Sequence, residues 1–253
     1  MEIKKYKLTE EIIKVDDSIL YRIEALRDFN GVKKGDKGGF VEKEENLSQY
    51  GDSWVYDDAM VFGNAEVFGN AEVYYNARVH DNAIVRGKAR VCQNAEIRGN
   101  ARIYDNALVH DNAIVSDNVI VCDNAVVGGN AKVSGNAVVY RNAKVRGKAV
   151  VFDDAEVLDN AVVYDKAEIY GNARVFGNAE IGGDAKVESP ADYIVFKNWW
   201  SSGRYFTWTR TNNMWKVGCF YGTGEQLIEK AYNDSEKSGR EYEKIVRYSE
   251  TVN

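Results

Sequence analysis

The sequence contains one proline, two histidines and three cysteines in 253 residues. Because proline interrupts hydrogen-bonded strands, its absence before Pro190 leaves a long stretch free to form an unbroken β-sheet ladder. Three widely separated cysteines are too few for a disulfide framework, so a reduced compartment is expected. Threonine is missing between Thr9 and Thr207, which excludes the threonine arrays of ice-binding repeat proteins.

The sequence also lacks an excess of positive charge and long apolar runs. The net charge of −6 argues against a general binder of nucleic acid or of anionic membranes. No segment approaches the length of a membrane span, and the opening MEIKKYKLTEEIIKV lacks the apolar core of a signal peptide. We therefore expect a cytoplasmic protein with no membrane partner.

What the sequence has in abundance is a six-residue repeat, which runs from Asp52 to Val187 without insertion or deletion. The unit reads aliphatic, variable, Gly or Asp, usually Asn, Ala, variable. All 23 aliphatic positions are Val or Ile, and only Ser53 and Val119 depart from Ala at the 23 small positions. Alternate residues of a strand face the same way, so the Ala and aliphatic side chains are predicted to point inward.

The Gly, Asp and Asn positions of the unit suit tight corners, because these residues tolerate left-handed backbone angles. Three strands and three corners close a triangular coil of about eighteen residues, and stacked coils cover one another's apolar edges. Residues 46–188 are therefore predicted to form an all-β parallel helix of about 7.5 coils. Its aliphatic core needs no cofactor to hold it together.

The segments beside the repeat are predicted to cover its ends, because open strand edges invite aggregation. Residues 1–45 contain two strand-like runs, Glu11–Val15 and Ile19–Leu26, joined by a turn at Asp16-Asp17-Ser18. We expect these residues to form a small N-terminal β cap.

Residues 189–253 differ in composition and hold four of the five tryptophans. Alternating polarity predicts two strands, Arg204–Arg210 and Met214–Phe220. We expect an α+β cap whose aromatic side chains form its core. The alternative is an aromatic ligand site, built from Trp199, Trp200 and Arg204.

The end of this C-terminal segment is predicted to be helical. Thr223 and Gln226 have the spacing of a capping box, and apolar residues follow at helical intervals. Gly239 is predicted to divide two helices.

The repeat resembles the hexapeptide-repeat, left-handed parallel β-helix family, which includes acyltransferases and γ-class carbonic anhydrases. One departure is that large side chains such as Tyr56, Phe62 and Tyr74 follow the aliphatic position, where the family usually has a small residue. The flanking segments resemble a group of uncharacterised phage and bacterial hexapeptide-repeat proteins, and the matching segments are Leu20–Asp28, Gly35–Val41, Asn46–Ser48 and Gly218–Phe220. The resemblance implies a left-handed coil, a homotrimer and phage origin, and it carries over no catalytic residue.

The known activities of the family depend on histidine. Its acyltransferases use a histidine base beside loops that interrupt the repeat, whereas His80 and His110 lie in identical VHDNAIV phrases with no loop. Its carbonic anhydrases need three histidine ligands for zinc. Pairs such as Cys92 with His110, or Asp105 with Asp123, are weaker alternatives as metal ligands. We predict no catalytic residue and no metal site.

The outward residues recur on three faces every eighteen residues. The first face, from Glu66 to Phe176, is the most continuously apolar, and a band of outward Leu, Ile and Val from Leu108 to Val126 crosses all three. Contiguous apolar surface is typical of an interface, so we expect a homotrimer.

The predicted function is that of a non-catalytic binding or assembly protein, phage-derived, which sequesters a host nucleotide signal between subunits. Arginine suits phosphate and tyrosine suits base stacking. The alternative is an acyltransferase with a CoA thioester donor. The predicted ligand-binding residues are Arg86, Arg102, Tyr104, Tyr140, His80 and Arg98.

Overall fold

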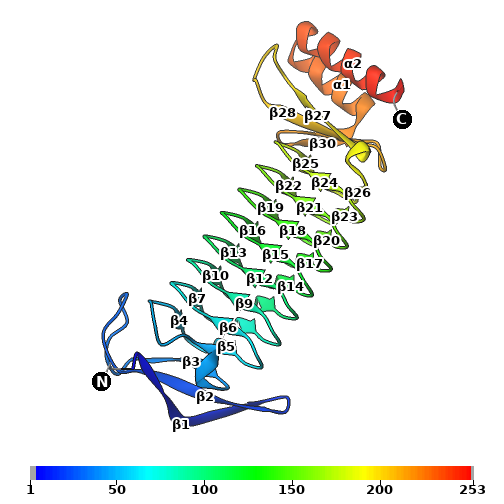
Figure 1. Cartoon of the computed structure of the whole chain (residues 1–253). Helices are drawn as coiled ribbons and strands as arrows, with labels where there is room; N and C mark the ends of the chain where they lie inside the picture. The colour runs from blue at the N-terminus through cyan, green and yellow to red at the C-terminus, as the bar shows by residue number, and fades with distance from the viewer. Residues whose placement is uncertain (1–3, 252–253) are drawn as a thin grey trace.

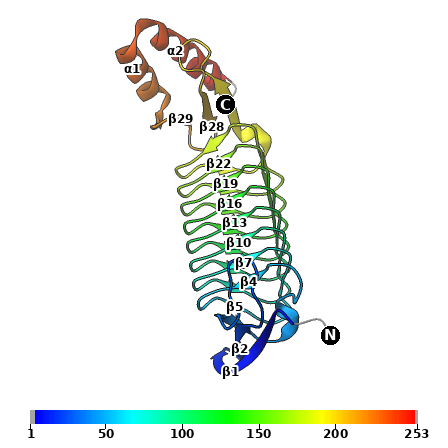
Figure 2. The same cartoon turned by 90° about the vertical axis from the view of Figure 1, so that its left-hand side faces the viewer.

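The computed structural model describes residues 4–251 as an elongated rod with a cap at each end (Figure 1). The rod consists of two-residue strands that recur every six residues, and each strand pairs in parallel with the strand eighteen residues further on. The view turned by 90° shows the coils as evenly spaced rungs (Figure 2). The predicted β-solenoid is confirmed, with between seven and eight turns. Its left-handed sense stays a prediction.

Three sheets form the sides of the rod, and they correspond to the three predicted faces. Sheet 1 contains β6 (Glu66–Val67), β9 (Ile84–Val85), β12 (Arg102–Ile103), β15 (Ile120–Val121), β18 (Val138–Val139), β21 (Glu156–Val157) and β24 (Arg174–Val175). Sheet 2 contains β4 (Trp54–Val55), β7 (Glu72–Val73), β10 (Arg90–Val91), β13 (Leu108–Val109), β16 (Val126–Val127), β19 (Lys144–Val145), β22 (Val162–Val163) and β25 (Glu180–Ile181). Sheet 3 contains β1 (Tyr6–Val15), β2 (Ser18–Ala25), β3 (Lys37–Val41), β5 (Met60–Val61), β8 (Arg78–Val79), β11 (Glu96–Ile97), β14 (Ile114–Val115), β17 (Lys132–Val133), β20 (Val150–Val151), β23 (Glu168–Ile169) and β26 (Lys186–Val187).

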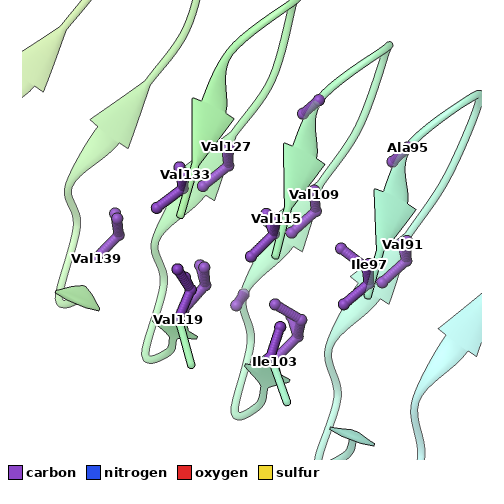
Figure 3. Packing of buried hydrophobic residues seen from close by; sticks show 14 of the residues in the cluster. Val91, Ala95, Ile97, Ile103, Val109, Val115, Val119, Val127, Val133 and Val139 are labelled. Carbon is purple, nitrogen blue, oxygen red and sulfur yellow. The ribbon is translucent and has the colours of Figure 1, made fainter. Parts of the chain in front are cut away.

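The core of the rod is made of the predicted inward residues. The Ala and the Val or Ile positions of the repeat are all buried, with at most 1% of any side chain exposed. Figure 3 shows them as layers: Val91, Val109 and Val127 stack in one row of successive turns, beside Ile97, Val115 and Val133 in the next. Because each layer is covered by identical layers, the aliphatic repeat is sufficient to specify the interior.

The three corners of the rod are held by side-chain ladders. Asparagine amides donate to the asparagine oxygen one turn further on, as in Asn82 to Asn100 at 3.1 Å, Asn94 to Asn112 at 3.0 Å and Asn124 to Asn142 at 3.3 Å. The residue before each asparagine has a positive φ, for example 59° at Asp81. Asp81 Oδ2 accepts the Gly99 backbone N–H at 2.9 Å. Aspartates of the repeat can thus accept a backbone N–H of the corner one turn further on.

The N-terminal cap extends the sheets of the rod. β1 and β2 form an antiparallel hairpin, and β3 pairs antiparallel with β2 but parallel with β5. A 3₁₀ turn, η1 (Glu44–Asn46), follows. The predicted hairpin is confirmed, although its first strand begins at Tyr6 rather than Glu11.

The C-terminal cap begins after η2 (Pro190–Asp192) and has a separate antiparallel sheet. This sheet contains β27 (Tyr193–Lys197), β28 (Tyr205–Thr209), β29 (Met214–Val217) and β30 (Phe220–Thr223), of which the first and last were not predicted. Trp200, Trp208 and Trp215 are buried with Phe206 in a core of their own, as the core interpretation of the aromatics predicted.

Two helices cover this sheet, α1 (Gly224–Asp234) and α2 (Glu236–Thr251). The capping box at Thr223 and Gln226 is confirmed. The predicted division at Gly239 is wrong, because the helices divide at Ser235. Gly239 lies inside α2, where a side chain would collide with the Tyr232 ring, so the glycine permits helix packing. Neither helix is both long enough and apolar enough to traverse a lipid bilayer.

Candidate functional site

The predicted ligand-binding residues lie on two of the three sheets. Arg86, Arg102, Tyr104 and Tyr140 belong to sheet 1 or to the corner that follows it, whereas His80 and Arg98 follow strands β8 and β11 of sheet 3. The chain passes directly from sheet 3 to sheet 1 in each turn, so these two sheets share one corner of the rod.

On sheet 1, Arg86 and Tyr104 form a stacked pair. The Arg86 guanidinium lies 4.7 Å from the centroid of the Tyr104 ring one turn above. Burial raises the pKa of Tyr104, so its hydroxyl stays protonated at neutral pH. Arg102 lies at the outward position of β12 and is exposed. These three residues place two guanidinium groups and one aromatic ring on adjacent turns.

On sheet 3, His80 is held by three neighbours. Its ring stacks on Phe62 with centroids 4.8 Å apart, Nδ1 lies 3.2 Å from Asp81 Oδ1 and Nε2 lies 3.3 Å from Glu96 Oε1. Arg98 Nε lies 3.5 Å from the same Glu96 oxygen. The structure therefore brings His80 and Arg98 together through Glu96. Sequence reasoning did not select Glu96, although its place one turn above Arg78 at the centre of the sheet offered a signal.

Tyr140 stands apart from this group. Cys122 separates it from Tyr104 along the column, and its hydroxyl donates to Glu156 Oε2 at 3.2 Å. Arg174 also pairs with Glu156, at 3.1 Å. Tyr140 therefore belongs to a second polar group nearer the C-terminal cap.

The other five predicted residues lie in two consecutive turns of the rod. His80 and Arg86 occupy the turn formed by β7, β8 and β9, and Arg98, Arg102 and Tyr104 occupy the next turn, formed by β10, β11 and β12. Four of these side chains carry or can carry positive charge. Two acids contact them on the sheet 3 side: Asp81 contacts His80, and Glu96 is shared between His80 and Arg98.

The second histidine lies on a different sheet, as predicted. His110 follows β13 of sheet 2, and its Nδ1 lies 3.0 Å from Asp111 Oδ2. Its ring covers Gly128, where any side chain would collide with it. Cys92 lies one turn below His110 but is buried. Because burial raises the pKa of the Cys92 thiol, it is a poor thiolate ligand.

Asp105, Cys122 and Asp123 form the one group of three potential metal ligands within residues 4–251. Asp105 Oδ2 accepts the Asp123 N–H at 3.4 Å, and Asp123 Oδ2 accepts the Arg141 N–H at 2.9 Å. Both carboxylates therefore accept backbone N–H groups at the corner of the rod, as the other aspartates of the repeat do. The Arg141 guanidinium forms its ion pair with Asp159 in the turn above.

The apolar column of sheet 1 is less exposed than its composition suggests. Tyr104 and Tyr140 are half-buried and Leu158 is buried within the chain, whereas 48% of Phe176 is exposed. Phe176 borders a groove of about 420 Å³ that also involves Tyr193, Ile194 and Tyr205. Sequence reasoning missed this groove, because its two sides are far apart along the chain.

Comparison with known proteins identifies the repeat. A family model described as YdcK Beta solenoid repeat matches residues 101–117 and 167–183, and both segments begin at an inward alanine of the rod. No curated protein matches the chain. Together with the stacked parallel coils, the family match shows a β-solenoid repeat protein.

Proposed function

We propose that this β-solenoid is a non-catalytic binding protein that assembles as a homotrimer and holds a nucleotide between its subunits. The observation that carries the proposal is the position of five predicted binding residues in two consecutive turns, on the two sheets that share one corner. If this corner points to a three-fold axis parallel to the rod, sheet 1 of each subunit faces sheet 3 of the next.

Rotation about such an axis does not change the height of a residue along the rod. Arg86, Arg102 and Tyr104 of one subunit would therefore stand opposite His80 and Arg98 of its neighbour. Guanidinium groups suit the phosphates of a nucleotide and the tyrosine ring suits its base. The resemblance to uncharacterised phage and bacterial repeat proteins supports a phage origin, and sequestering a host nucleotide signal is the role that this proposal assigns to the bound nucleotide.

Assembly is tested by measuring the mass of the protein in solution. Light scattering should give three times the 28.4 kDa of the chain. Ile120 on sheet 1 and Ile114 on sheet 3 are half-buried at outward strand positions. Val126 occupies the equivalent position on sheet 2 and is also half-buried. Ile120→Asp and Ile114→Asp should each give monomers, whereas Val126→Asp should remain trimeric. A monomeric parent protein, or equal loss of mass in all three variants, contradicts the arrangement.

Ligand binding is tested by denaturing the purified protein and identifying released small molecules by mass spectrometry. Arg102 and Arg90 are exposed arginines at equivalent positions of one turn, on sheets 1 and 2. Arg102→Gln should lower the amount of released nucleotide at least about tenfold, since a charged hydrogen bond contributes 1.5–3 kcal/mol. Arg90→Gln should retain it. If the protein is a trimer but releases no nucleotide, the proposed assembly stands and the proposed ligand is wrong.

Catalysis is tested separately. Both ring nitrogens of His80 are engaged by carboxylates, which disfavours its use as a free general base. We expect no acetyl-CoA consumption with amine or amino-sugar acceptors. Turnover that disappears in His80→Ala or His110→Ala would instead establish the acyltransferase alternative, because a general base contributes about 10²–10⁴-fold.

A further inference from the structure

The C-terminal cap contains a pocket of about 380 Å³ between its sheet and its two helices. This volume is in the range of small-molecule sites. Its apolar wall comes from Val217, Phe220 and Leu227, which also belong to the core of the cap or pack against it. The polar groups that line it are Asn198, Ser201, Ser202, Arg204, Lys230, Asp234, Ser238 and Tyr242.

Hydrogen bonds within the cap fix the direction of a donor at this pocket. The Ser201 backbone N–H donates to Asn198 Oδ1 at 3.0 Å, which identifies that atom as the oxygen. The Asn198 Nδ2 group must then donate to the Tyr242 hydroxyl, at 2.9 Å. The Tyr242 oxygen is an acceptor in this bond, and its own proton has no acceptor among residues 4–251.

Tyr242 and Asn198 are both deeply buried, with 7% and 4% of their surfaces exposed. Burial raises the pKa of Tyr242, so the hydroxyl keeps its proton at neutral pH. A buried donor without an acceptor is costly, and a ligand that accepts its hydrogen bond removes that cost. Tyr242 lines the pocket, so the acceptor for its hydroxyl can come from outside the chain.

The charges around the pocket indicate what kind of acceptor it takes. Arg204 and Lys230 line it, and neither forms an ion pair with another residue in the described part of the chain. Asp234 is the one acid in the lining, and its charge and that of Arg204 shift the pKa of Tyr242 in opposite directions. Two cations and one hydroxyl donor beside an apolar wall form a complementary surface for an anion with an apolar body.

We propose that this pocket binds a small organic carboxylate, with its oxygens at Arg204, Lys230 and the Tyr242 hydroxyl and its apolar part against Val217, Phe220 and Leu227. This site lies in one chain and does not depend on the trimer or on the nucleotide. It gives a role to the buried Asn198 in the loop before β28, whose bond to the Tyr242 oxygen leaves the hydroxyl proton available to the carboxylate.

The test uses phenylacetate as the probe and the neutral phenylacetamide as its isosteric control, each titrated into the full-length protein by calorimetry. Phenylacetate should bind with a Kd of about 1 mM or tighter, and phenylacetamide at least about tenfold more weakly. Equal affinity for the two compounds, or no binding of phenylacetate up to 10-fold above that concentration, overturns the proposal.

Two variants assign the contacts. Tyr242→Phe keeps the ring and removes the hydroxyl, and Arg204→Gln removes an exposed charge without touching the core; each should weaken phenylacetate binding about tenfold. Arg240→Gln is the control, because Arg240 is on α2, pairs with Glu236 and does not line the pocket. If Tyr242→Phe fails to fold, Arg204→Gln decides. Unchanged affinity in Arg204→Gln contradicts the proposal.

Cys219 provides an independent readout, because this exposed thiol lines the pocket whereas Cys92 is buried. Saturating phenylacetate should slow alkylation of Cys219 by iodoacetamide several-fold, as measured by peptide mass spectrometry, and phenylacetamide should not. Equal labelling rates with and without phenylacetate would place its binding elsewhere and reject this pocket.

Discussion

At each end of the solenoid, the last strands have backbone groups that no further turn pairs with. The two ends satisfy these groups with different kinds of contact. At the N-terminal end, β3 continues sheet 3 as a true strand, and side-chain donors reach carbonyls that no strand covers. Lys5 Nζ donates to Ser53 O at 2.8 Å, Arg22 Nη1 to Asp57 O at 2.9 Å and Asn46 Nδ2 to Ala65 O at 2.9 Å.

At the C-terminal end, hydroxyl groups replace the missing strands. The Tyr193 hydroxyl accepts the Phe176 N–H at 3.2 Å and donates to Arg174 O at 2.9 Å. Thr211 does the same for the N–H and carbonyl of Lys186, at 3.0 and 2.8 Å. A hydroxyl both donates and accepts, so one side chain satisfies one N–H and one carbonyl at the end of a sheet.

The difference determines which parts of the molecule share a core. Tyr6, Ile23 and Phe29 of the N-terminal cap are packed in one continuous cluster with the solenoid. The C-terminal cap has its own cluster around Trp208 and Trp215. It contributes Tyr193 to the solenoid cluster, and hydrogen bonds from Thr207 and Thr211 add to its contacts with the last turns. The N-terminal cap should therefore unfold with the rod, and the C-terminal cap should be able to keep its structure without it.

The largest effect is expected from a charge inside the rod. Val121→Asp buries an unpaired carboxylate between stacked turns and should destabilise the solenoid by more than about 3 kcal/mol. Circular dichroism should report loss of the β-sheet signal. Fluorescence, which comes mostly from the four tryptophans of the C-terminal cap, should stay native-like. Simultaneous loss of both signals would show that the C-terminal cap, like the N-terminal cap, unfolds together with the rod.

The second prediction concerns the buried lysine of the N-terminal cap. Burial lowers the pKa of Lys5 from 10.5 to about 8, so the unfolded chain binds a proton between these pH values and the folded chain does not. Stability must then rise with pH in this window, by about 2 kcal/mol between pH 7 and 10. The measurement is denaturant unfolding of the parent relative to Lys5→Met, which lacks this group. An equal pH dependence in both proteins contradicts the assignment.

A smaller effect is expected where the C-terminal cap meets the rod. Thr207 Oγ1 accepts the Glu180 N–H at 2.9 Å, so Thr207→Val should cost about 1 kcal/mol and accelerate hydrogen exchange at the Glu180 amide. Thr209→Val is the control, since Thr209 lies on the same strand and bonds within the cap. Faster exchange at Glu180 in both variants would indicate general loosening rather than loss of this contact.

The smallest effect is expected on the outer surface of the rod. Glu156 accepts hydrogen bonds from Tyr140 and Arg174 but remains partly exposed, so Glu156→Ala should change stability by about 0.5 kcal/mol or less. Chemical denaturation measured beside Val121→Asp checks the inward and outward assignment. Similar destabilisation by the two substitutions would contradict it.

The sequence predicts the rod far better than it predicts the caps, for a physical reason. Each inward Ala or Val of the repeat contacts equivalent residues one turn away, so a local pattern determines the packing. The capping contacts join residues with no shared pattern, such as Lys5 with Ser53 and Thr207 with Glu180. Ser53 is an exception at an alanine position, and only the structure shows that its hydroxyl lies 3.2 Å from the buried ammonium group.

The same reason limits how much of the candidate sites can be predicted from the sequence. The spacing of Arg86 and Tyr104 by eighteen residues predicts that they lie on adjacent turns, and they do. The pocket beside Tyr242 depends on the direction of a hydrogen bond from Asn198, 44 residues away, which no local pattern encodes.

The asparagine ladders have a consequence for how the chain finds its register during folding. Each amide bonds to an equivalent residue eighteen positions away, so a rod displaced by one whole turn would keep almost all of its internal bonds. Such a displaced state would be a kinetic trap that differs from the native state only at the ends. The non-repeating contacts of the two caps therefore fix the register of the stacked turns. Insertion of one complete turn would lengthen the rod without changing the contacts of either cap.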